Sequence, residues 1–432
     1  MVGAHWSKGW VIEDCELYQA KCSGISIGKH LQPGNENKWA SGSKKSGTQN
    51  ERDVICRAVN EGWSKETVGS HTIRRCHIHD CGQTGIVGHL GCAFSLIEDN
   101  HIHHINNKQE LDGAEIGGIK LHAAIDTVIR RNHIHHCTRG LWLDWQAQGT
   151  RVTRNLFHHN TPPTGTRILY HLEMGEDIFV EVSHGPTLID NNLLLSDYAC
   201  RLSTQGVAMV HNLIAGSFTK VGTGTDNGGL PRYTPYHEPH GTRINGFMTF
   251  LHGDMRFFNN IFLQQEIRSC FDADMEPLNI RLNKETGTFV YDEYPSPEEY
   301  EALFSDGNLF RYDRYYTKLP VESEGNLFAN GARPCRTEKE YVLAEQPLSF
   351  SLEERSDGWY FRLAGMPEDA AWPARIVDTD RMGIAFQPEQ RFEAPDGSDI
   401  VIDRDYFGSL RQPTIVPGPF ARIPGAEELR VW

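Results

Sequence analysis

The segment RNHIHHCTRGLWLDWQAQGTRVTRNLFHHN, residues 131–160, holds one full copy of a motif that recurs along the chain. The motif is an asparagine followed by apolar residues, and its copies here begin at Asn132 and Asn155, 23 residues apart. That spacing is too short for a helix pair or a propeller blade. It suits one coil of a parallel β-helix, in which three short strands join through tight turns.

The motif returns on both sides of this segment. Because asparagine tolerates a left-handed backbone and can bond to its counterpart in the next coil, we predict an asparagine ladder at one turn. The motif stops near residue 330. We therefore predict an all-β fold, a right-handed parallel β-helix over residues 1–330, with a small β-rich cap over residues 331–432. The other copies begin at Asn100, Asn192, Asn212, Asn260, Asn308 and Asn326, and a relative without the asparagine begins at Cys76.

Composition excludes several classes of partner. The formal charge is -15, with 42 basic against 57 acidic residues, whereas nucleic acids and anionic membranes require a basic face. No apolar stretch approaches the ~20 residues of a membrane span, and the first residues lack the pattern of a secretion signal. The ten cysteines form no CxxC pair. We expect free thiols, a reducing and hence cytoplasmic location, and a neutral ligand.

The first residues already follow the solenoid pattern. Residues 10–28, WVIEDCELYQAKCSGISIG, predict strand, turn and strand with no polar capping element before them. Solenoid ends need covers. We expect a shortened chain, a homo-oligomer, or a partner region over the N-terminal end. Residues 34–53 are polar and predict a loop, and the Ser-Pro-Glu-Glu run from Ser296 predicts a short helix.

Histidines crowd the early copies of the motif. In the phrase HIHH the isoleucine points inward, which leaves the imidazoles on the outer face or at a turn. We favour stacked polar ladders over a zinc site, and predict no metal, because no carboxylate or thiol recurs beside them at ligand spacing. The histidines are His77, His79, His101, His103, His104, His133, His135, His136, His158 and His159.

Aligning the coils by their strand starts brings two acids together. The fifth positions of four successive strands are His89, His122, Asp144 and Glu181, and Arg201 is the match expected in the next strand. Residues in one register of successive coils lie ~4.8 Å apart, so Asp144 and Glu181 should be direct neighbours.

The alternation of apolar residues predicts which way these acids point. Leu141 and Leu143 are inward, so Trp142 and Asp144 should share the outer, solvent-facing side with Phe179 and Glu181. One interpretation is an exposed acid ladder relieved by Arg201, Lys120 and His122. The alternative is catalytic, because retaining glycosidases need two carboxyl groups only ~5 to 5.5 Å apart, and an aromatic face can take the apolar side of a sugar ring.

Four segments resemble glycoside hydrolase family 120, the parallel β-helix β-xylosidases. They are GAEIGGIKLH (113–122), GLWLDWQAQGTRVTRNLF (140–157), DIFVEVSHGPTLIDNNLLLS (177–196) and PRYTPYHEPHGT (231–242). The resemblance spans roughly residues 1–330. It implies that Asp144 is the nucleophile, Glu181 the acid/base and Glu115 a sugar-subsite acid.

The resemblance implies a retaining exo-glycosidase that removes terminal β-linked xylose from xylo-oligosaccharides by double displacement, without metal or organic cofactor. Two features depart from the family. Residues 161–175 look inserted between the acids, and we expect that a long N-terminal part with a β-sandwich region, which family members carry, is missing. The residues expected to bind substrate are Glu115, Lys120, His122, Trp142, Trp145, His184, Arg201, His237 and His240.

Two other functions fit a parallel β-helix. One is a lyase or hydrolase that depolymerises an acidic polysaccharide, although it would need a cationic groove and a basic proton abstractor, which the net charge disfavours. The other is a solenoid that binds carbohydrate without catalysis. Hydrolysis of an aryl β-xyloside separates the three functions.

Overall fold

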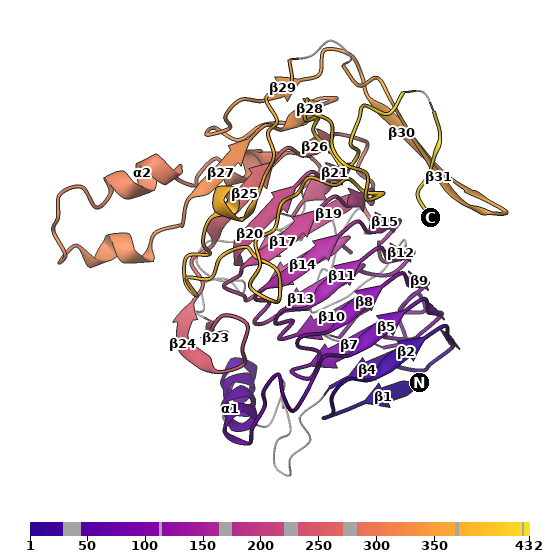
Figure 1. Cartoon of the computed structure of the whole chain (residues 1–432), viewed down its shortest axis with the longest axis vertical. Helices are drawn as coiled ribbons and strands as arrows, with labels where there is room; N and C mark the ends of the chain where they lie inside the picture. Colours follow the sequence, from indigo (N-terminus) through magenta and orange to yellow (C-terminus); the bar gives the residue numbers. More distant parts are fainter. Residues whose placement is uncertain are drawn as a thin grey trace.

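The computed structural model describes residues 1–28, 45–111, 115–163, 175–219, 232–270, 283–367, 371–425 and 427–432. Within these ranges the chain is a right-handed parallel β-helix, as predicted, with its rungs stacked along the long axis of the molecule (Figure 1). All ten cysteines are free thiols. Among the described helices, none is long and apolar enough to cross a membrane.

Three parallel sheets form the walls of the β-helix in the described ranges. The first sheet contains β1 (Val2–Ala4), β4 (Ser23–Ile27), β7 (Thr84–His89), β10 (Gly117–His122), β13 (Leu141–Asp144), β16 (Ile178–Glu181), β19 (Tyr198–Ser203) and β22 (Ser217–Phe218). The second contains β2 (Val11–Glu13), β5 (Thr72–Arg74), β8 (Leu96–Glu98), β11 (Val128–Arg130), β14 (Thr150–Thr153), β17 (Thr187–Asp190), β20 (Gln205–Val210), β25 (Gly253–Phe258) and β27 (Val321–Glu324). The third contains β3 (Glu16–Tyr18), β6 (His77–His79), β9 (His101–His103), β12 (His133–His135), β15 (Leu156–His158), β18 (Leu193–Leu194), β21 (Leu213–Ile214), β26 (Ile261–Leu263), β28 (Leu327–Ala329) and β29 (Val342–Leu343).

The bore of the β-helix is filled by aliphatic side chains from all three sheets. Ile102 and Ile134, each between two histidines of one strand, are fully buried in this core, as the alternation predicted. Leu143 and Val180 enter the same core from the first sheet. Burial of each such side chain contributes roughly 1.5–3 kcal/mol, so the inward residues hold every rung in one register.

The predicted asparagine ladder is present at the turn between the second and third sheets. The side-chain oxygen of Asn132 accepts the backbone N–H of Asn100, and the side-chain oxygen of Asn155 accepts the backbone N–H of Asn132. The side-chain amide of Asn132 donates to Asn155 Oδ1, and the side-chain amide of Asn155 donates to Asn192 Oδ1. The left-handed conformation lies one residue earlier than predicted, at positions such as Arg131 and Arg154. Asn308 is exposed and stands outside the ladder, in which Asn260 bonds directly to Asn326.

We expect Asn155→Ala to lower the free energy of unfolding by about 2–4 kcal/mol. The substitution removes the acceptor of the buried Asn132 N–H and the donations of the Asn155 amide to Ile129 O, Thr153 O and Asn192 Oδ1. Each buried polar group left unsatisfied costs about 1–3 kcal/mol. Urea denaturation followed by circular dichroism measures the change, and Asn308→Ala, which alters an exposed asparagine outside the ladder, should leave the midpoint unchanged.

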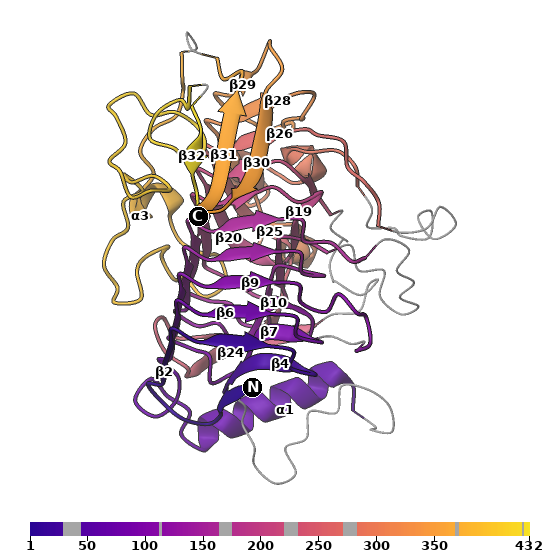
Figure 2. The ribbon, with the colours of Figure 1, turned by 90° about the vertical axis from the view of Figure 1, so that its right-hand side faces the viewer.

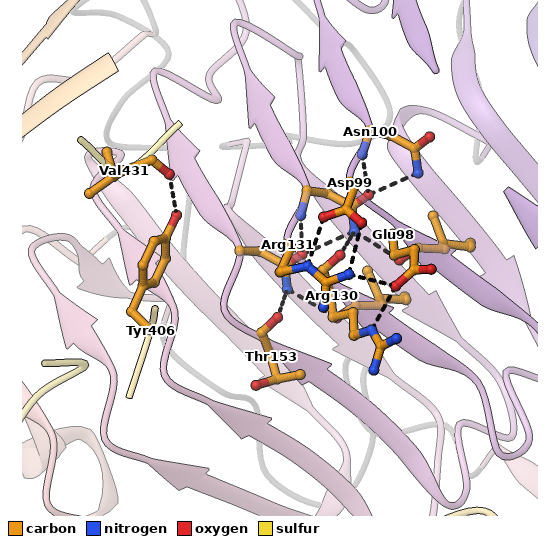
Figure 3. Close-up of polar contacts among 12 residues, drawn as sticks. Glu98, Asp99, Asn100, Arg130, Arg131, Thr153, Tyr406 and Val431 are labelled. Atoms are coloured by element: carbon orange, nitrogen blue, oxygen red, sulfur yellow. Dashed lines mark hydrogen bonds and ion pairs between the residues drawn. The ribbon is translucent and has the colours of Figure 1, made fainter. Parts of the chain in front are cut away.

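The second sheet carries an ion-pair ladder on its outer face (Figure 3). Arg131 forms a bidentate pair with Asp99 at 2.7 and 2.8 Å and also contacts Glu98, to which Arg130 donates at 2.8 Å. These arginines are about one-third exposed, and partly exposed pairs of this kind contribute little to stability. Their acids and bases neutralise one another, so this described part of the face carries no strong excess of either charge.

Several described segments lie outside the three sheets. The helix α1 (Gly47–Asn60), capped by Ser46, begins within residues 34–53, where a loop was predicted; that prediction was wrong for its C-terminal part, and residues 29–44 lie outside the described ranges. A hairpin of β23 (Tyr233–His237) and β24 (Ile244–Thr249) contacts α1. The short helix predicted from Ser296 is confirmed as α2 (Pro297–Ala302). The other helical segments within the described residues are η2 (Thr288–Tyr291), η3 (Tyr312–Tyr316) and α3 (Thr379–Met382).

The C-terminal part folds back along the β-helix. The hairpin of β30 (Ser349–Arg355) and β31 (Gly358–Ala364), joined by β32 (Leu429–Arg430), lies over the third sheet (Figure 2). Trp359 and Trp432 from this hairpin region contact histidine rings of that sheet. The predicted antiparallel structure after residue 331 is therefore present.

Candidate active site

The two acids predicted as neighbours are paired across adjacent strands. In the first sheet Asp144 of β13 pairs with Glu181 of β16, and His122 of β10 pairs with both His89 of β7 and Asp144. Parallel strands lie about 4.8 Å apart, so the two carboxylates project from consecutive rungs at one edge of the sheet.

The prediction that Arg201 occupies the same register as Asp144 and Glu181 was wrong. Arg201 pairs with Phe179, and Ser203 pairs with Glu181. The reason is a shorter turn into the second sheet. Thr187 pairs with Val207, and Thr187 lies six residues after Glu181 whereas Val207 lies only four after Ser203.

The outward direction of the acids is confirmed, but the face is not open to solvent as expected. Asp144 and Glu181 are each 5 % exposed, Trp142 is 6 % exposed and Phe179 is 1 % exposed. The side chains covering this face come from neighbouring strands and from segments distant in sequence. An exposed acid ladder is therefore excluded, and the two acids lie in a largely desolvated site.

Cations cover the two stacked aromatic rings of this face. Trp142 and Phe179 stack with centroids 5.0 Å apart. The Lys120 ammonium lies 3.5 Å from the centroid of the Trp142 ring, and the Arg139 guanidinium lies 4.5 Å from it. Arg201 lies 4.2 Å from the Phe179 ring. These cation–π contacts place positive charge beside the acid pair, where it offsets the repulsion of two neighbouring carboxylates.

One oxygen of Asp144 is held by two bases. Lys120 Nζ donates to Asp144 Oδ2 at 2.8 Å, and His122 Nε2 lies 3.4 Å from the same oxygen. Both bases also reach Glu115, at 3.1 Å from Lys120 Nζ to Oε2 and 3.3 Å from His122 Nε2 to Oε1. The other oxygen of Asp144, Oδ1, is buried and accepts no hydrogen bond from the described residues.

The charges of this cluster reinforce one another. Burial alone would raise the pKa of Glu115, but the nearby Lys120 and His122 outweigh burial and lower it. Burial alone would lower the pKa of Lys120 and of His122, but Asp144 and Glu115 raise both. These opposite charges therefore favour the ionised form of Glu115 and the protonated forms of Lys120 and His122.

We expect Lys120→Met to lower the free energy of unfolding by about 3–5 kcal/mol at pH 7, because removing one partner of a buried ion pair leaves the other uncompensated. Lys120 holds the pKa of Glu115 below its unfolded value, so this stability is present above pH ~4.3 and is lost as the pH falls through the lowered folded pKa. The difference between the variant and the wild type should therefore shrink below about pH 4.

Denaturation curves at pH 7 and pH 3.5 test this sign. Lys339→Met is the control, because Lys339 forms a half-exposed pair with Glu298 and should change stability by under about 1 kcal/mol. An equal loss of stability at both pH values would contradict the electrostatic origin.

Both oxygens of Glu181 have donors. Arg232 Nη1 donates to Oε1 at 2.7 Å, and Trp142 Nε1 donates to Oε2 at 3.2 Å. Trp142 therefore links the two rungs, since its ring lies under Lys120 while its indole N–H reaches the second acid. This contact gives the tryptophan beside Asp144 a polar role in addition to its apolar one.

Besides Arg139, which lies over the Trp142 ring, sequence reasoning missed two further residues of the site. Glu51 of α1 is 2 % exposed, accepts a hydrogen bond from His89 Nε2 at 3.0 Å and lies 3.9 Å from His122 Nδ1. Nothing in the polar run around Glu51 pointed to this position. Arg232 stood within a segment that resembles the family, and that segment was the available signal.

Four predicted substrate-binding side chains contact residues outside the acid cluster, although Trp145 also lies beside Arg232, whose guanidinium is 5.9 Å from the Trp145 ring centroid. Trp145 is fully buried and packs with Val182 and Phe250. The other three are histidines: His184 bonds Met248 O at 3.1 Å, His237 bonds Thr242 O at 2.8 Å and Gln146 Oε1 at 3.0 Å, and His240 bonds Asp126 at 3.0 Å and Glu393 at 3.2 Å. As placed, these four support the walls of the site. Residues 164–174, the greater part of the predicted insertion, lie outside the described ranges.

Comparison with known proteins gives two findings that bear on this site. A family profile described as a right-handed beta helix region matches residues 55–214. The solved complex of XylC with xylose is 37 % identical, with a TM-score of 0.85, and the match covers 100 % of this chain and 62 % of that one. This chain thus spans less than two-thirds of that relative. A tailspike protein, Dettilon gp208, at 9 % identity over 87 % of this chain and 69 % of its own, has a TM-score of 0.33 and carries no argument. A search of curated sequences found no match.

Proposed function

Because the motifs, the fold and the XylC match fit glycoside hydrolase family 120, the parallel β-helix β-xylosidases, we propose that this chain is a xylosidase-like glycoside hydrolase. We further propose that it is a retaining exo-enzyme that releases terminal β-linked xylose from xylo-oligosaccharides. The observation that carries the proposal is the pairing of Asp144 with Glu181 on consecutive rungs. A strand spacing of about 4.8 Å is close to the ~5–5.5 Å between the carboxyl groups of retaining glycosidases.

In the first step Asp144 attacks the anomeric carbon while Glu181 protonates the departing glycosidic oxygen. Oδ2 of Asp144 is held by Lys120 and His122, so Oδ1 is the oxygen available to form the ester bond. The bond from the anomeric carbon to the leaving oxygen breaks, and the proton of Glu181 moves to that oxygen. The product is a covalent glycosyl–Asp144 intermediate and a free alcohol.

In the second step Glu181 removes a proton from water, and the resulting oxygen displaces Asp144 from the anomeric carbon. The sugar leaves with its original anomeric configuration, and both carboxyl groups return to their starting states. Arg232 and Trp142 each donate to one oxygen of Glu181 and so keep it oriented through both steps. Neither step uses a metal or organic cofactor.

The test of this function is a panel of aryl glycosides with defined sugars and linkages. We expect hydrolysis of the β-xyloside to exceed that of the α-xyloside and the hexosides. Proton NMR of the first turnovers should show β-xylose before mutarotation, which distinguishes retention from inversion. Immediate appearance of α-xylose would exclude double displacement, and the absence of any hydrolysis would favour a non-catalytic sugar-binding solenoid.

The described contacts disfavour depolymerisation of an acidic polysaccharide. A uronate requires cations that are free to bind its carboxylate. The cations at this site are already engaged, since Lys120 contacts Asp144 and Glu115, and Arg232 contacts Glu181. A neutral pentose imposes no such demand.

A further inference from the structure

The outer face of the third sheet carries an array of imidazoles that the proposed catalysis does not use. The first and third residues of β6, β9 and β12 are all histidines, and their registers align directly. The turn that follows adds one more histidine to several rungs. We call this the histidine array; its members are His77, His79, His101, His103, His104, His133, His135, His136, His158 and His159.

The predicted stacking of these rings is confirmed. Rings of one column lie 4.7–5.1 Å apart between centroids and are nearly parallel from rung to rung. The array is partly exposed at its N-terminal end, where His77, His101 and His103 lie, and it is buried further along, where Trp359 and Trp432 cover His133. Solvent therefore reaches the rungs of β6 and β9.

Ring nitrogens of neighbouring columns point at one another. His77 Nε2 lies 2.7 Å from His103 Nε2, and His101 Nε2 lies 2.8 Å from His135 Nε2. Two such nitrogens can approach this closely only if a proton or a cation lies between their lone pairs. Around the first pair, ligand nitrogens of His77, His101 and His103 all lie within 4.8 Å of one another.

Three imidazoles at the N-terminal end of the array, those of His77, His101 and His103, have lowered pKa values. Burial, reinforced by the neighbouring histidines, lowers the pKa of His101 to about 4 and that of His103 to about 3. Burial and His79 also lower the pKa of His77. Neutral imidazole is the form that binds a metal.

We propose that His77, His101 and His103 bind one divalent transition-metal ion of the zinc type. Three imidazoles and a water molecule form a known zinc ligand set, and nitrogen ligands suit Zn²⁺, Cu²⁺ and Ni²⁺ better than Mg²⁺ or Ca²⁺. A tetrahedral ion with Zn–N bonds of about 2.0–2.1 Å requires nitrogens about 3.3 Å apart, so the rings must rotate to bring nitrogens that now lie within 4.8 Å of one another to this spacing.

Glu16 supports this choice of triad. Its Oε1 lies 3.6 Å from His77 Nδ1, on the side of the ring away from His103. When a metal replaces the proton between the two Nε2 atoms, the proton of His77 can move to Nδ1, where the carboxylate stabilises it. Such carboxylate–histidine–metal arrangements orient metal ligands in many proteins.

The ion would join two successive rungs, because His77 belongs to β6 whereas His101 and His103 belong to β9. The proposed catalytic acids lie on the first sheet, and the array lies on the third. The metal proposal is therefore independent of the proposed glycosidase activity, and we expect the ion to stabilise the β-helix.

Zinc titration of the untagged full chain, after removal of metals with a chelator, tests the proposal by calorimetry. We expect saturable binding of one Zn²⁺ per chain and a higher melting temperature with zinc. Co²⁺ bound at the same place should give the intense visible absorption of a tetrahedral site. His103→Gln should weaken binding by about tenfold or more and abolish the Co²⁺ spectrum.

His77→Gln is the second variant, since His77 is half-exposed and its replacement spares the core if His103→Gln unfolds. His159→Gln is the matched control, because His159 is an exposed member of the array outside the triad. The proposal is overturned if zinc binding does not saturate near one ion, if it survives in folded His77→Gln and His103→Gln, or if His159→Gln weakens it equally.

Discussion

Asp144→Ala is expected to lower kcat on an aryl β-xyloside by at least about 10⁴-fold, because Asp144 is the group proposed to form the covalent intermediate. The carboxylate is held for attack by Lys120 and His122 on Oδ2, with Oδ1 left free of hydrogen bonds from described residues. The measurement is single-substrate kinetics at saturating xyloside. Circular dichroism should show that the variant is folded before its rate is interpreted.

Chemical rescue makes the assignment of Asp144 specific. In Asp144→Gly, added azide should enter the vacated space and attack the anomeric carbon directly, giving the glycosyl azide of inverted configuration. Glu238→Gln is the control, since Glu238 is a partly exposed acid whose side chain is 45 % accessible, and the activity of this variant should match the wild type. Full activity of Asp144→Ala, or rescue that yields a product of retained configuration, would contradict the role of nucleophile.

Glu181→Ala is expected to lose about 10²- to 10⁴-fold in kcat/KM on xylobiose, the size of a general acid–base contribution. The loss should be much smaller in the glycosylation of a dinitrophenyl β-xyloside, whose leaving group departs without a proton. The second step then becomes limiting, because no base activates water. Pre-steady-state kinetics should therefore show a burst of dinitrophenolate followed by slow turnover.

Azide distinguishes the role of Glu181 from that of Asp144. In Glu181→Ala, azide should accelerate the second step and yield the glycosyl azide of retained configuration, because it attacks the covalent intermediate. Glu181→Gln keeps the size of the side chain but cannot transfer a proton, so it should behave like the alanine variant. Wild-type turnover of xylobiose by either variant would show that another group supplies the proton.

The β-helix and the pairing of its acids followed from local features of the chain. The spacing of the asparagine motif gave the length of a coil, and the alternation around Ile102 and Ile134 showed which side chains enter the bore. A slip of one residue would turn every such isoleucine outward, so the pattern allows one register. The same rule placed Asp144 opposite Glu181, as the strand pairing confirms.

The rule failed where a turn changed length. Arg201 lies at the same distance from its ladder asparagine as Asp144 does, yet it pairs with Phe179 because the turn after Ser203 is shorter. The number of residues between a strand and its ladder asparagine cannot show which turn has gained or lost residues. The strand pairing is set by packing of the inward side chains, which the count does not include.

Only the tertiary structure decided what covers the acids and what the histidines face. Alternation indicates the side of a sheet to which a residue points, but Glu51 and Arg232 reach the site from α1 and from the segment before β23. Their positions depend on long insertions whose course no periodic pattern encodes. Likewise, the 2.7 Å approach of His77 to His103 arises between adjacent rungs, from the stagger of their rings. Short-range patterns therefore determined the scaffold, whereas contacts between distant segments determined the chemistry of its surfaces.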